Sequence, residues 1–191
     1  MSSVPTEVHG SALVLMCGRA FSGKSTMSRE IAGGLDAEIV SLDAINEERG
    51  LIGGQGIPVE EWVRTNDEAT RRVLELLEAG NWVVVDDTSS LRFLRDNWRG
   101  TARDAGAAFA LVYVDTPENV VLERLKRNRE QPVRNDVSDA VMEEHIAGFE
   151  PPERDEEYVT ASSFPDDVRS MISAVQAKIS APENPGRSRF A

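Results

Sequence analysis

The sequence predicts an α/β domain in which a parallel β-sheet carries helices on both faces. Short apolar runs such as Ala12–Cys17 and Ala108–Asp115 alternate with longer segments whose apolar residues recur every three to four positions. The first pattern is typical of strands buried on both faces, and the second of amphipathic helices. Regular alternation of the two implies right-handed crossovers between parallel strands. In such a sheet, ligands bind beyond the carboxyl ends of the strands.

The individual elements follow from these periodicities and from the residues that end them. We expect strands at Ala12–Cys17, Ala37–Asp43, Trp82–Asp87, Ala108–Asp115 and Glu157–Ala161. We expect helices at Lys24–Gly34, Val59–Ala79, Leu91–Ala105, Val137–Gly148 and Val168–Ile179, and one from Thr116-Pro117 into the basic cluster "ERLKRNRE". Gly33-Gly34 and Gly80 are expected to end the helices before them, and Thr116 to cap the helix that Pro117 opens. The chain then divides into a flexible N-terminus (1–10), one domain (11–180) with a lid at about 124–150, and a flexible tail (181–191).

Composition and charge exclude several classes of protein. The net charge is −12, and the segment Glu130–Asp167 contributes −10 of it, with 12 acids against two arginines. Proteins that neutralise a polyanion usually present a basic surface, so nucleic acid is not the expected partner. No apolar run approaches the ~18 residues of a membrane span, and the N-terminus lacks the pattern of a signal peptide. The single cysteine, Cys17, fits a cytoplasmic protein without disulfides, and two histidines do not suffice for a structural zinc site.

The stretch "GRAFSGKS" (Gly18–Ser25) follows the first strand and opens the first helix. It matches the phosphate-binding pattern G-x-x-x-x-G-K-[ST] in full. Its glycines let successive backbone N–H groups point at phosphate oxygens, and the helix adds its positive dipole end. Lys24 would reach the outer phosphates, and the Ser25 hydroxyl would ligate Mg²⁺. The candidate nucleotide-contacting residues are Gly18, Arg19, Ala20, Phe21, Ser22, Gly23, Lys24, Ser25 and Thr26.

Other motifs narrow the class of nucleotide-binding protein. The D-x-x-G and N-K-x-D motifs of a GTPase do not occur. "LIGGQ" (Leu51–Gln55) is close to the signature of ABC-type ATPases, but Ile52 stands where that signature has its phosphate-contacting serine, so we expect a loop. A small nucleotide-dependent kinase remains, or an ATPase that uses hydrolysis for switching.

Four segments resemble the P-loop kinases that include polynucleotide 5′-kinase, zeta toxins and chloramphenicol phosphotransferase. They are "GRAFSGKST", "SLDAINEERG", "VVVDDTSSLRFLR" and "RLKRNRE…FEPPE", and they span about Gly18 to Glu153. The resemblance implies a three-layer P-loop NTPase fold of adenylate-kinase-like order with an arginine-bearing lid. It also implies ATP and Mg²⁺ as nucleotide and metal.

The resemblance assigns roles at the ends of two strands. It places the catalytic aspartate at Asp43 and its companion arginine at Arg49. A carboxylate there can orient the acceptor hydroxyl and take its proton, although an aspartate before "AINEER" is also a favoured helix N-cap. Asp86 or Asp87 would hold Mg²⁺ through water or bind the acceptor, or would cap the next helix. Arg95 matches a recurrent arginine on the acceptor side of these kinases.

The basic helix end supplies the remaining charge that phosphoryl transfer needs. Arg124 and Arg127 lie three residues apart and therefore share a helix face. Arginines on a lid can bring guanidinium groups onto the phosphates when substrate binds. The alternative is that this basic helix end is simply exposed to solvent. Arg134, in the expected lid loop, is a weaker candidate. The aromatic residues Trp62, Phe93 and Trp98 would line an acceptor pocket or belong to the core.

The sequence therefore predicts a kinase that transfers the γ-phosphate of ATP to a hydroxyl of a small molecule, such as an antibiotic, a nucleoside or a sugar nucleotide. Its catalytic residues would be Asp43, Lys24, Arg124 and Arg127. One alternative is a polynucleotide 5′-hydroxyl kinase, which requires a basic channel leading to Asp43. The other is a regulatory switch that binds ATP without an acceptor.

Overall fold

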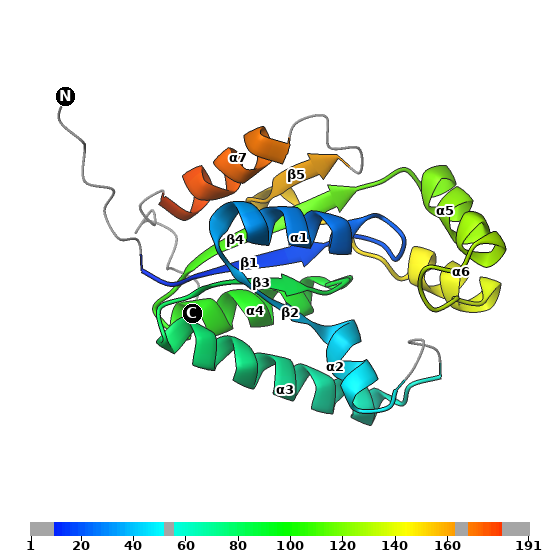
Figure 1. Ribbon diagram of the computed structural model, residues 1–191, viewed down its shortest axis with the longest axis horizontal. Coiled ribbons are helices and arrows are strands. Elements are labelled where there is room, and N and C mark those ends of the chain that lie inside the picture. The colour runs from blue at the N-terminus through cyan, green and yellow to red at the C-terminus, as the bar shows by residue number, and fades with distance from the viewer. Residues whose placement is uncertain (1–9, 52–55, 163–167, 181–191) are drawn as a thin grey trace.

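A five-stranded parallel sheet forms the centre of the molecule in the computed structural model, which describes residues 10–51, 56–162 and 168–180 (Figure 1). The strands are β1 (Ala12–Cys17), β2 (Glu38–Ser41), β3 (Trp82–Asp86), β4 (Ala108–Asp115) and β5 (Val159–Ser162). Their order across the sheet is β2-β3-β1-β4-β5, and every neighbouring pair is parallel. The predicted α/β fold is confirmed.

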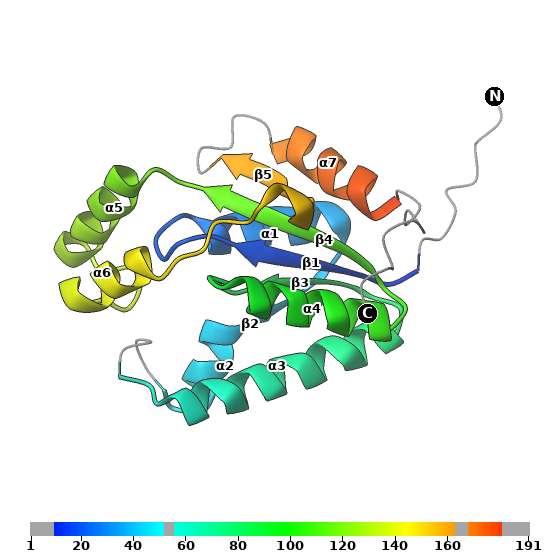
Figure 2. The same cartoon turned by 180° about the vertical axis from the view of Figure 1, so that it is seen from behind.

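Helices cover both faces of the sheet. They are α1 (Lys24–Leu35), α2 (Leu42–Glu48), α3 (Val59–Glu78), α4 (Arg92–Asp104), α5 (Glu118–Glu130), α6 (Asp139–Ala147) and α7 (Val168–Ser180), with a 3-10 turn η1 (Arg154–Glu156). Helices α1 and α7 lie on one face and α3 and α4 on the other (Figure 2). No helix of the described part of the chain is long and apolar enough to cross a membrane.

The central strand β1 shows why this sheet needs two covered faces. All six of its residues are buried, and they alternate between two apolar cores. Leu13 and Leu15 pack with Val73 of α3 and Trp98 of α4, whereas the intervening residues, such as Val14, pack with α1 and α7. Alternate residues of a strand point to opposite faces, so an unbroken apolar run fits only between two layers.

Helices α5 and α6 extend beyond the carboxyl ends of the strands as a separate lobe (Figure 1). A third, smaller core joins this lobe to the loop after β1. It contains Phe21 from that loop, Val121 and Leu125 from α5, Val137 from the following loop, and Met142 from α6. The lobe overlaps the segment expected as a lid (about 124–150), although α5 begins earlier, at Glu118.

Several element boundaries differ from the expectation by one or two residues, and three of them show a local feature at the helix end. Strand β2 ends at Ser41 rather than at Asp43, because the Ser41 hydroxyl accepts a hydrogen bond from Ala44 N (3.3 Å) and caps α2. Gly33-Gly34 lie inside α1, which continues to Leu35 and is closed by Asp36 in the left-handed conformation (φ 53°). Pro117, not Thr116, occupies the N-cap of α5.

Two other expectations concern the aromatic residues and one loop. Trp98 is buried in the core, Phe93 is 58% exposed, and Trp62 lines the cavity described below. Residues 52–55 of the expected loop Leu51–Pro58 lie outside the described residues.

Candidate functional site

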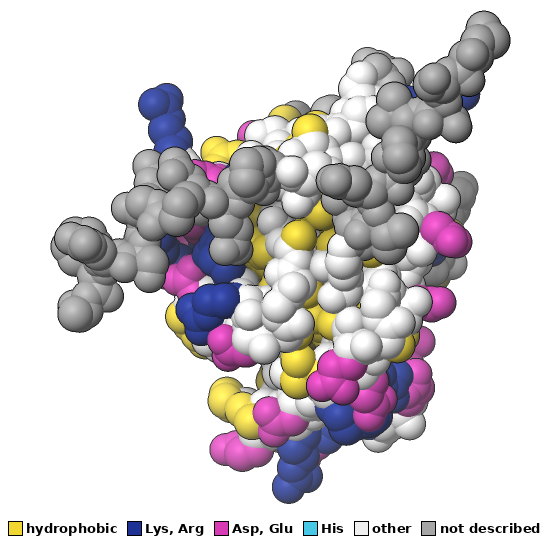
Figure 3. Space-filling view, turned by 90° about the vertical axis from the view of Figure 1, so that its left-hand side faces the viewer, with side chains coloured by type: hydrophobic (Ala, Val, Ile, Leu, Met, Phe, Trp, Pro, Cys, Tyr) yellow, Lys and Arg dark blue, Asp and Glu magenta, His cyan; other side chains and the backbone are white. Residues whose placement is uncertain are grey.

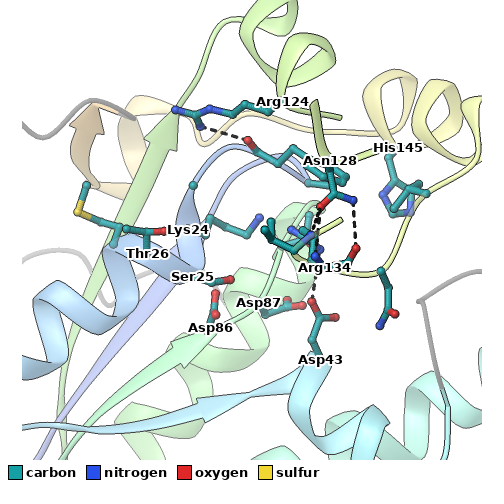
Figure 4. Close-up of a pocket in the computed structure, with 18 of the residues that line it drawn as sticks. Lys24, Ser25, Thr26, Asp43, Asp86, Asp87, Arg124, Asn128, Arg134 and His145 are labelled. Carbon is teal, nitrogen blue, oxygen red and sulfur yellow. Dashed lines mark hydrogen bonds and ion pairs between the residues drawn. The ribbon is translucent and has the colours of Figure 1, made fainter. Parts of the chain in front are cut away.

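A cavity of about 870 Å³ lies beyond the carboxyl ends of β1, β2 and β3 (Figure 4). The loop after β1 and the start of α1 form one wall, α2 and the end of β3 form a second, and α5, α6 and their connection form a third. Segments that are far apart in the sequence thus meet where parallel-sheet proteins bind ligands.

The loop after β1 depends on its two glycines. Gly18 has φ +154°, and a Cβ there would lie 2.9 Å from the Val114 carbonyl oxygen. Gly23 has φ +102°, immediately before α1, and a Cβ there would lie 3.2 Å from the Arg124 guanidinium. A side chain at either position would strain the backbone and crowd a neighbour. The close-approach cradle of a phosphate-binding loop is therefore present and fits phosphate groups.

Lys24 is the buried cation of this loop. Its ammonium donates a hydrogen bond to the Arg19 carbonyl oxygen (2.8 Å), and the residue is only 8% exposed. Burial lowers the pKa of Lys24, while the nearby carboxylates of Asp86 and Asp87 act in the opposite sense. The side chain points into the cavity (Figure 4), where phosphate oxygens would give its charge a stronger partner.

The other loop residues divide between cavity and interior. Those that line the cavity are Ala20, Phe21, Gly23, Lys24, Ser25 and Thr26. Arg19 instead places its guanidinium 5.1 Å from the centre of the Phe149 ring, and Ser22 is 1% exposed. Arg19, Ser22 and Gly18 can therefore contribute backbone groups but not side chains to a ligand in this cavity.

The two aspartates at the end of β3 have different surroundings. The Asp87 carboxylate accepts hydrogen bonds from Ser89 N (2.7 Å) and Ser89 Oγ (2.9 Å), and burial raises its pKa. Ser89 is itself buried and left-handed (φ 43°), so its hydroxyl holds Asp87 and does not face an acceptor. Asp86, with no such bonds among the described residues, keeps both carboxylate oxygens available to the cavity.

Asp43 lies in the first turn of α2, with its side chain 69% exposed. The alternative that Asp43 is the N-cap of this helix is wrong, because Ser41 fills that position. Its carboxylate points toward the space shared with Lys24 and Asp86 (Figure 4) and lies 3.8 Å from the Arg134 guanidinium.

The expected lid brings three arginines to the cavity. Arg124 donates to the Phe21 (3.2 Å) and Ser22 (2.7 Å) carbonyl oxygens of the phosphate-binding loop. Arg127 is 68% exposed and pairs with Glu123 at 2.9 Å. Arg134 stacks over the Phe21 ring at 4.5 Å from its centre. All three line the cavity, and Arg124 already links the lid to the loop.

Asn128 is a residue of this lid that the sequence analysis missed. Its amide nitrogen donates to the Arg134 carbonyl (3.0 Å), and its amide oxygen accepts from Val133 N (3.1 Å) and Arg134 N (3.2 Å). The residue is 5% exposed. It therefore fixes the turn that presents Arg134. The only signal in the sequence was an asparagine inside an arginine-rich helix end.

Arg49 and Arg95 are not where the sequence analysis expected them, because neither lines the cavity. Arg49 donates to the Glu61 carbonyl (2.8 Å) and pairs with the Glu61 carboxylate, which ties α2 to α3. Arg95 is 1% exposed, pairs with the buried Glu156 at 2.6 Å and donates to the carbonyls of Ser89 and Glu150 (both 3.0 Å). In this structure both guanidinium groups are paired with groups of the protein itself.

The residues present fit a Mg²⁺ ion only in company with phosphates. No group of three His, Cys, Asp or Glu side chains that could hold a metal occurs among the described residues. Ser25, at the start of α1, and Asp86, at the end of β3, both face the cavity (Figure 4). This pair suits a cation that keeps several waters and takes its remaining ligands from a nucleotide.

The sheet order, the glycine loop and the arginine-bearing lobe together define the fold of the P-loop kinases, and solved structures share it. Kti12 from Chaetomium thermophilum, in complex with ADP-AlF3, superposes with a TM-score of 0.73 at 15% identity, covering 88% of this chain and 100% of that one. A putative kinase from Chloroflexus aurantiacus gives 0.68 at 20%, covering 89% and 99%. The APS kinase CysC of Mycobacterium tuberculosis, in complex with AMPPNP and APS, gives 0.61 at 20%, covering 91% and 99%.

Residues 13–152 match the AAA domain family AAA_33, and the chain belongs to this family. The match includes the phosphate-binding loop, the acids Asp43, Asp86 and Asp87, and the lid. No curated protein sequence matches the chain. The resemblance to P-loop kinases that the motifs indicated is confirmed.

Proposed function

We propose that the protein is an ATP- and Mg²⁺-dependent kinase that transfers the γ-phosphate to a hydroxyl group of a small molecule. One observation carries the proposal: the Asp43 carboxylate, the Lys24 ammonium and the lid arginines line one cavity from three different sides. Phosphoryl transfer to an alcohol needs a carboxylate at the hydroxyl and positive charge around the phosphates.

Each side chain has a defined task in this proposal. The loop amides and Lys24 hold the β- and γ-phosphates, and Ser25 and Asp86 hold Mg²⁺, which would neutralise charge on the phosphates. Asp43 orients the acceptor hydroxyl and takes its proton as the oxygen attacks. The Asp43 carboxylate is exposed and borders the cavity, so an acceptor can reach it.

The lid arginines would complete the site when the nucleotide binds. Arg124 now donates to carbonyl oxygens of the loop, and phosphate oxygens would be stronger partners for it. Within the described part of the chain, the ion pair of Arg127 is an exposed one with Glu123, which is weak and easily exchanged. Closure of the lid would direct both guanidinium groups at the charge that develops on the transferred group.

The two alternatives are a polynucleotide 5′-hydroxyl kinase and a switch that hydrolyses ATP. The acids beside Asp43 argue against a polyanionic acceptor. The similarity in fold to Kti12, whose structure contains ADP-AlF3, is the reason to measure ATP hydrolysis without transfer as well.

The test is transfer of labelled γ-phosphate from ATP to two pools of acceptors in parallel, one of hydroxylated small molecules and one of oligonucleotides with free 5′-hydroxyls. We expect label on a small molecule, reduced at least ~100-fold by Asp43→Asn. Asp67→Asn is the matched control, because Asp67 is an exposed residue of α3 outside the cavity. Label on the oligonucleotides would favour the first alternative. ATP hydrolysis without any transfer would favour the second.

A further inference from the structure

Two sides of the cavity carry charges of opposite sign, whereas α1 contributes both signs, as Lys24, Arg29 and Glu30. Helix α2 and the end of β3 contribute only acids, namely Asp43, Glu47, Asp86 and Asp87. The lid contributes arginines, namely Arg124, Arg127 and Arg134. The end of the molecule away from the lid has no such separation: acidic and basic side chains lie next to one another along its lower edge (Figure 3).

One face of α2 produces the acidic side. Asp43, Asn46 and Glu47 are spaced by three and four residues, so they lie on the same side of the helix, and all three line the cavity. The charged residues that follow are neutralised elsewhere: Glu48 pairs with Arg72, and Arg49 with Glu61. Glu47 has no ion pair among the described residues and is exposed, so its charge is available to a ligand.

Asn46 gives an independent indication that this face binds something. The residue is 3% exposed, and its amide oxygen accepts a hydrogen bond from the Thr65 hydroxyl (2.5 Å). Among the residues that the structure describes, its amide nitrogen Nδ2 has no hydrogen-bond partner. A buried donor without a partner is costly and needs an explanation. An oxygen atom of a ligand in the cavity would satisfy it after a small shift of the side chain.

Apolar groups stand beside these polar ones. Trp62, in the first turns of α3, and Leu51, after α2, also line the cavity. They offer a surface for a carbon skeleton. An acceptor that carried carboxylate or phosphate groups would meet the like charges of Asp43 and Glu47. Arg134, which could offset them, already pairs with Asp43.

We propose that the acceptor is a hydroxylated amine, such as an amino alcohol or an amino sugar, whose ammonium group pairs with Glu47. This rests on the proposed kinase function. Asn46 Nδ2 donates to one oxygen of the acceptor, while Asp43 takes the proton of the reacting hydroxyl. The acceptor oxygen forms a bond to the γ-phosphorus, the bond from that phosphorus to the β–γ bridging oxygen breaks, and ADP leaves. The ammonium group is unchanged.

The test compares acceptors of the same carbon skeleton in which one substituent changes the charge. Serinol, glycerol and glycerate form one matched trio, and glucosamine, glucose and glucuronate form another. Their binding to the full chain, with Mg²⁺ and a non-hydrolysable ATP analogue, is measured by calorimetry below the pKa of the amines. We expect the amine of at least one trio to bind ~10-fold or more tightly than its neutral partner, which is what one charge-assisted hydrogen bond supplies. The anion should bind most weakly.

Variants show whether Glu47 is the source of that preference. Glu47→Gln should reduce the preference for the amine to less than ~3-fold while leaving affinity for the ATP analogue unchanged. Glu78→Gln, at the exposed end of α3 and outside the cavity, should keep it. Stronger binding of an anion, no binding of either amine, or a preference that survives Glu47→Gln would overturn the inference. Selective binding of an amine without phosphate transfer would instead contradict the kinase function and leave the charge selection standing.

Discussion

The Arg134 guanidinium lies 3.8 Å from the Asp43 carboxylate and stacks at the same time over the Phe21 ring. One side chain of the lid thus contacts both the acceptor side of the cavity and the phosphate-binding loop. Asn128 holds the backbone from which it projects. Arg134 therefore links the lid to both sides of the cavity.

Arg134→Gln should loosen the lid in the absence of ligand. The variant loses a cation–π contact and a weak ion pair, each worth about 0.5–1 kcal/mol, so hydrogen exchange at residues 131–137 should rise several-fold. Affinity for ATP should fall by about 3–10-fold for the same reason. Arg103→Gln removes an exposed arginine of α4 and should change neither quantity. Unchanged exchange in the Arg134 variant would mean that Asn128, the third core and the hydrogen bonds of Arg124 to the loop are sufficient to hold the lid.

Gly23→Ala should damage the phosphate-binding loop directly. The left-handed backbone at this position costs a residue with a side chain about 1–2 kcal/mol, and its Cβ would approach Arg124. Both the free energy of unfolding and the affinity for ATP should fall.

Gly100→Ala is the matched control. Gly100 lies inside α4, where an added Cβ meets nothing closer than Arg103 at 3.9 Å. This variant should be stabilised by about 0.5–1 kcal/mol, because alanine loses less backbone entropy in a helix. Urea denaturation of both variants measures the contrast, and equal changes in the two would refute the argument from backbone geometry.

Much of this fold could be predicted from local patterns. Strands β1 and β4 begin and end as predicted, because continuous apolar runs bounded by glycine or polar residues leave little choice. The end of β2 was missed although the sequence carries the signal: Ser41 followed by an acidic first turn is a helix start. Leu42 continues the apolar pattern of the strand, so the pattern alone suggested two residues too many.

The candidate site also has one part that local sequence patterns predict and another part that they do not. The glycine loop was predictable because its chemistry is local, and the contiguous match defines each residue. The positions of Arg49 and Arg95 could not be predicted. Their partners Glu61 and Glu156 lie 12 and 61 residues away, and no spacing rule connects either arginine with its partner. An arginine near an expected site is equally compatible with binding a ligand and with a buried ion pair, and only tertiary contacts distinguish the two.

The Arg95–Glu156 pair should be important for stability. Both side chains are almost fully buried, and Arg95 also donates to two backbone carbonyls. Arg95→Met leaves Glu156 buried without its cation. We expect this change to lower the free energy of unfolding by about 3–5 kcal/mol. The exposed pair of Arg103 and Asp104 provides the comparison, and Arg103→Ala should cost no more than about 0.5 kcal/mol. A similarly small loss for Arg95→Met would mean that water reaches Glu156 in the variant.

Cys17 should be unreactive in the folded protein. It is fully buried at the end of β1, and burial raises the pKa of its thiol to about 12. At pH 8 the thiolate fraction is then on the order of 10⁻⁴, so alkylation should be ~10³-fold slower than for free cysteine. Urea should restore the ordinary rate. Rapid labelling without denaturant would instead show that the end of β1 opens in solution.

Asp87 should make stability depend on pH in a direction unusual for a carboxylate. Burial raises its pKa despite the Ser89 hydrogen bonds and the Lys24 charge, so the folded state favours the protonated form. A raised pKa contributes stability that is complete below the unfolded value, about 4, and is lost as the pH rises through the folded value.

Asp87→Asn removes that titration and keeps an oxygen to accept from Ser89 N and Oγ. The free energy of unfolding of the wild type, relative to this variant, should therefore decline from pH 4 upward and level off above the folded pKa. The size of the decline gives the shift, at about 1.4 kcal/mol per pKa unit. Asp67→Asn, exposed on α3, should show no such trend. The opposite result would be a wild type that becomes more stable than the variant as the pH rises. It would mean that the Ser89 hydrogen bonds and the Lys24 charge outweigh burial, and that the folded protein holds Asp87 as a carboxylate.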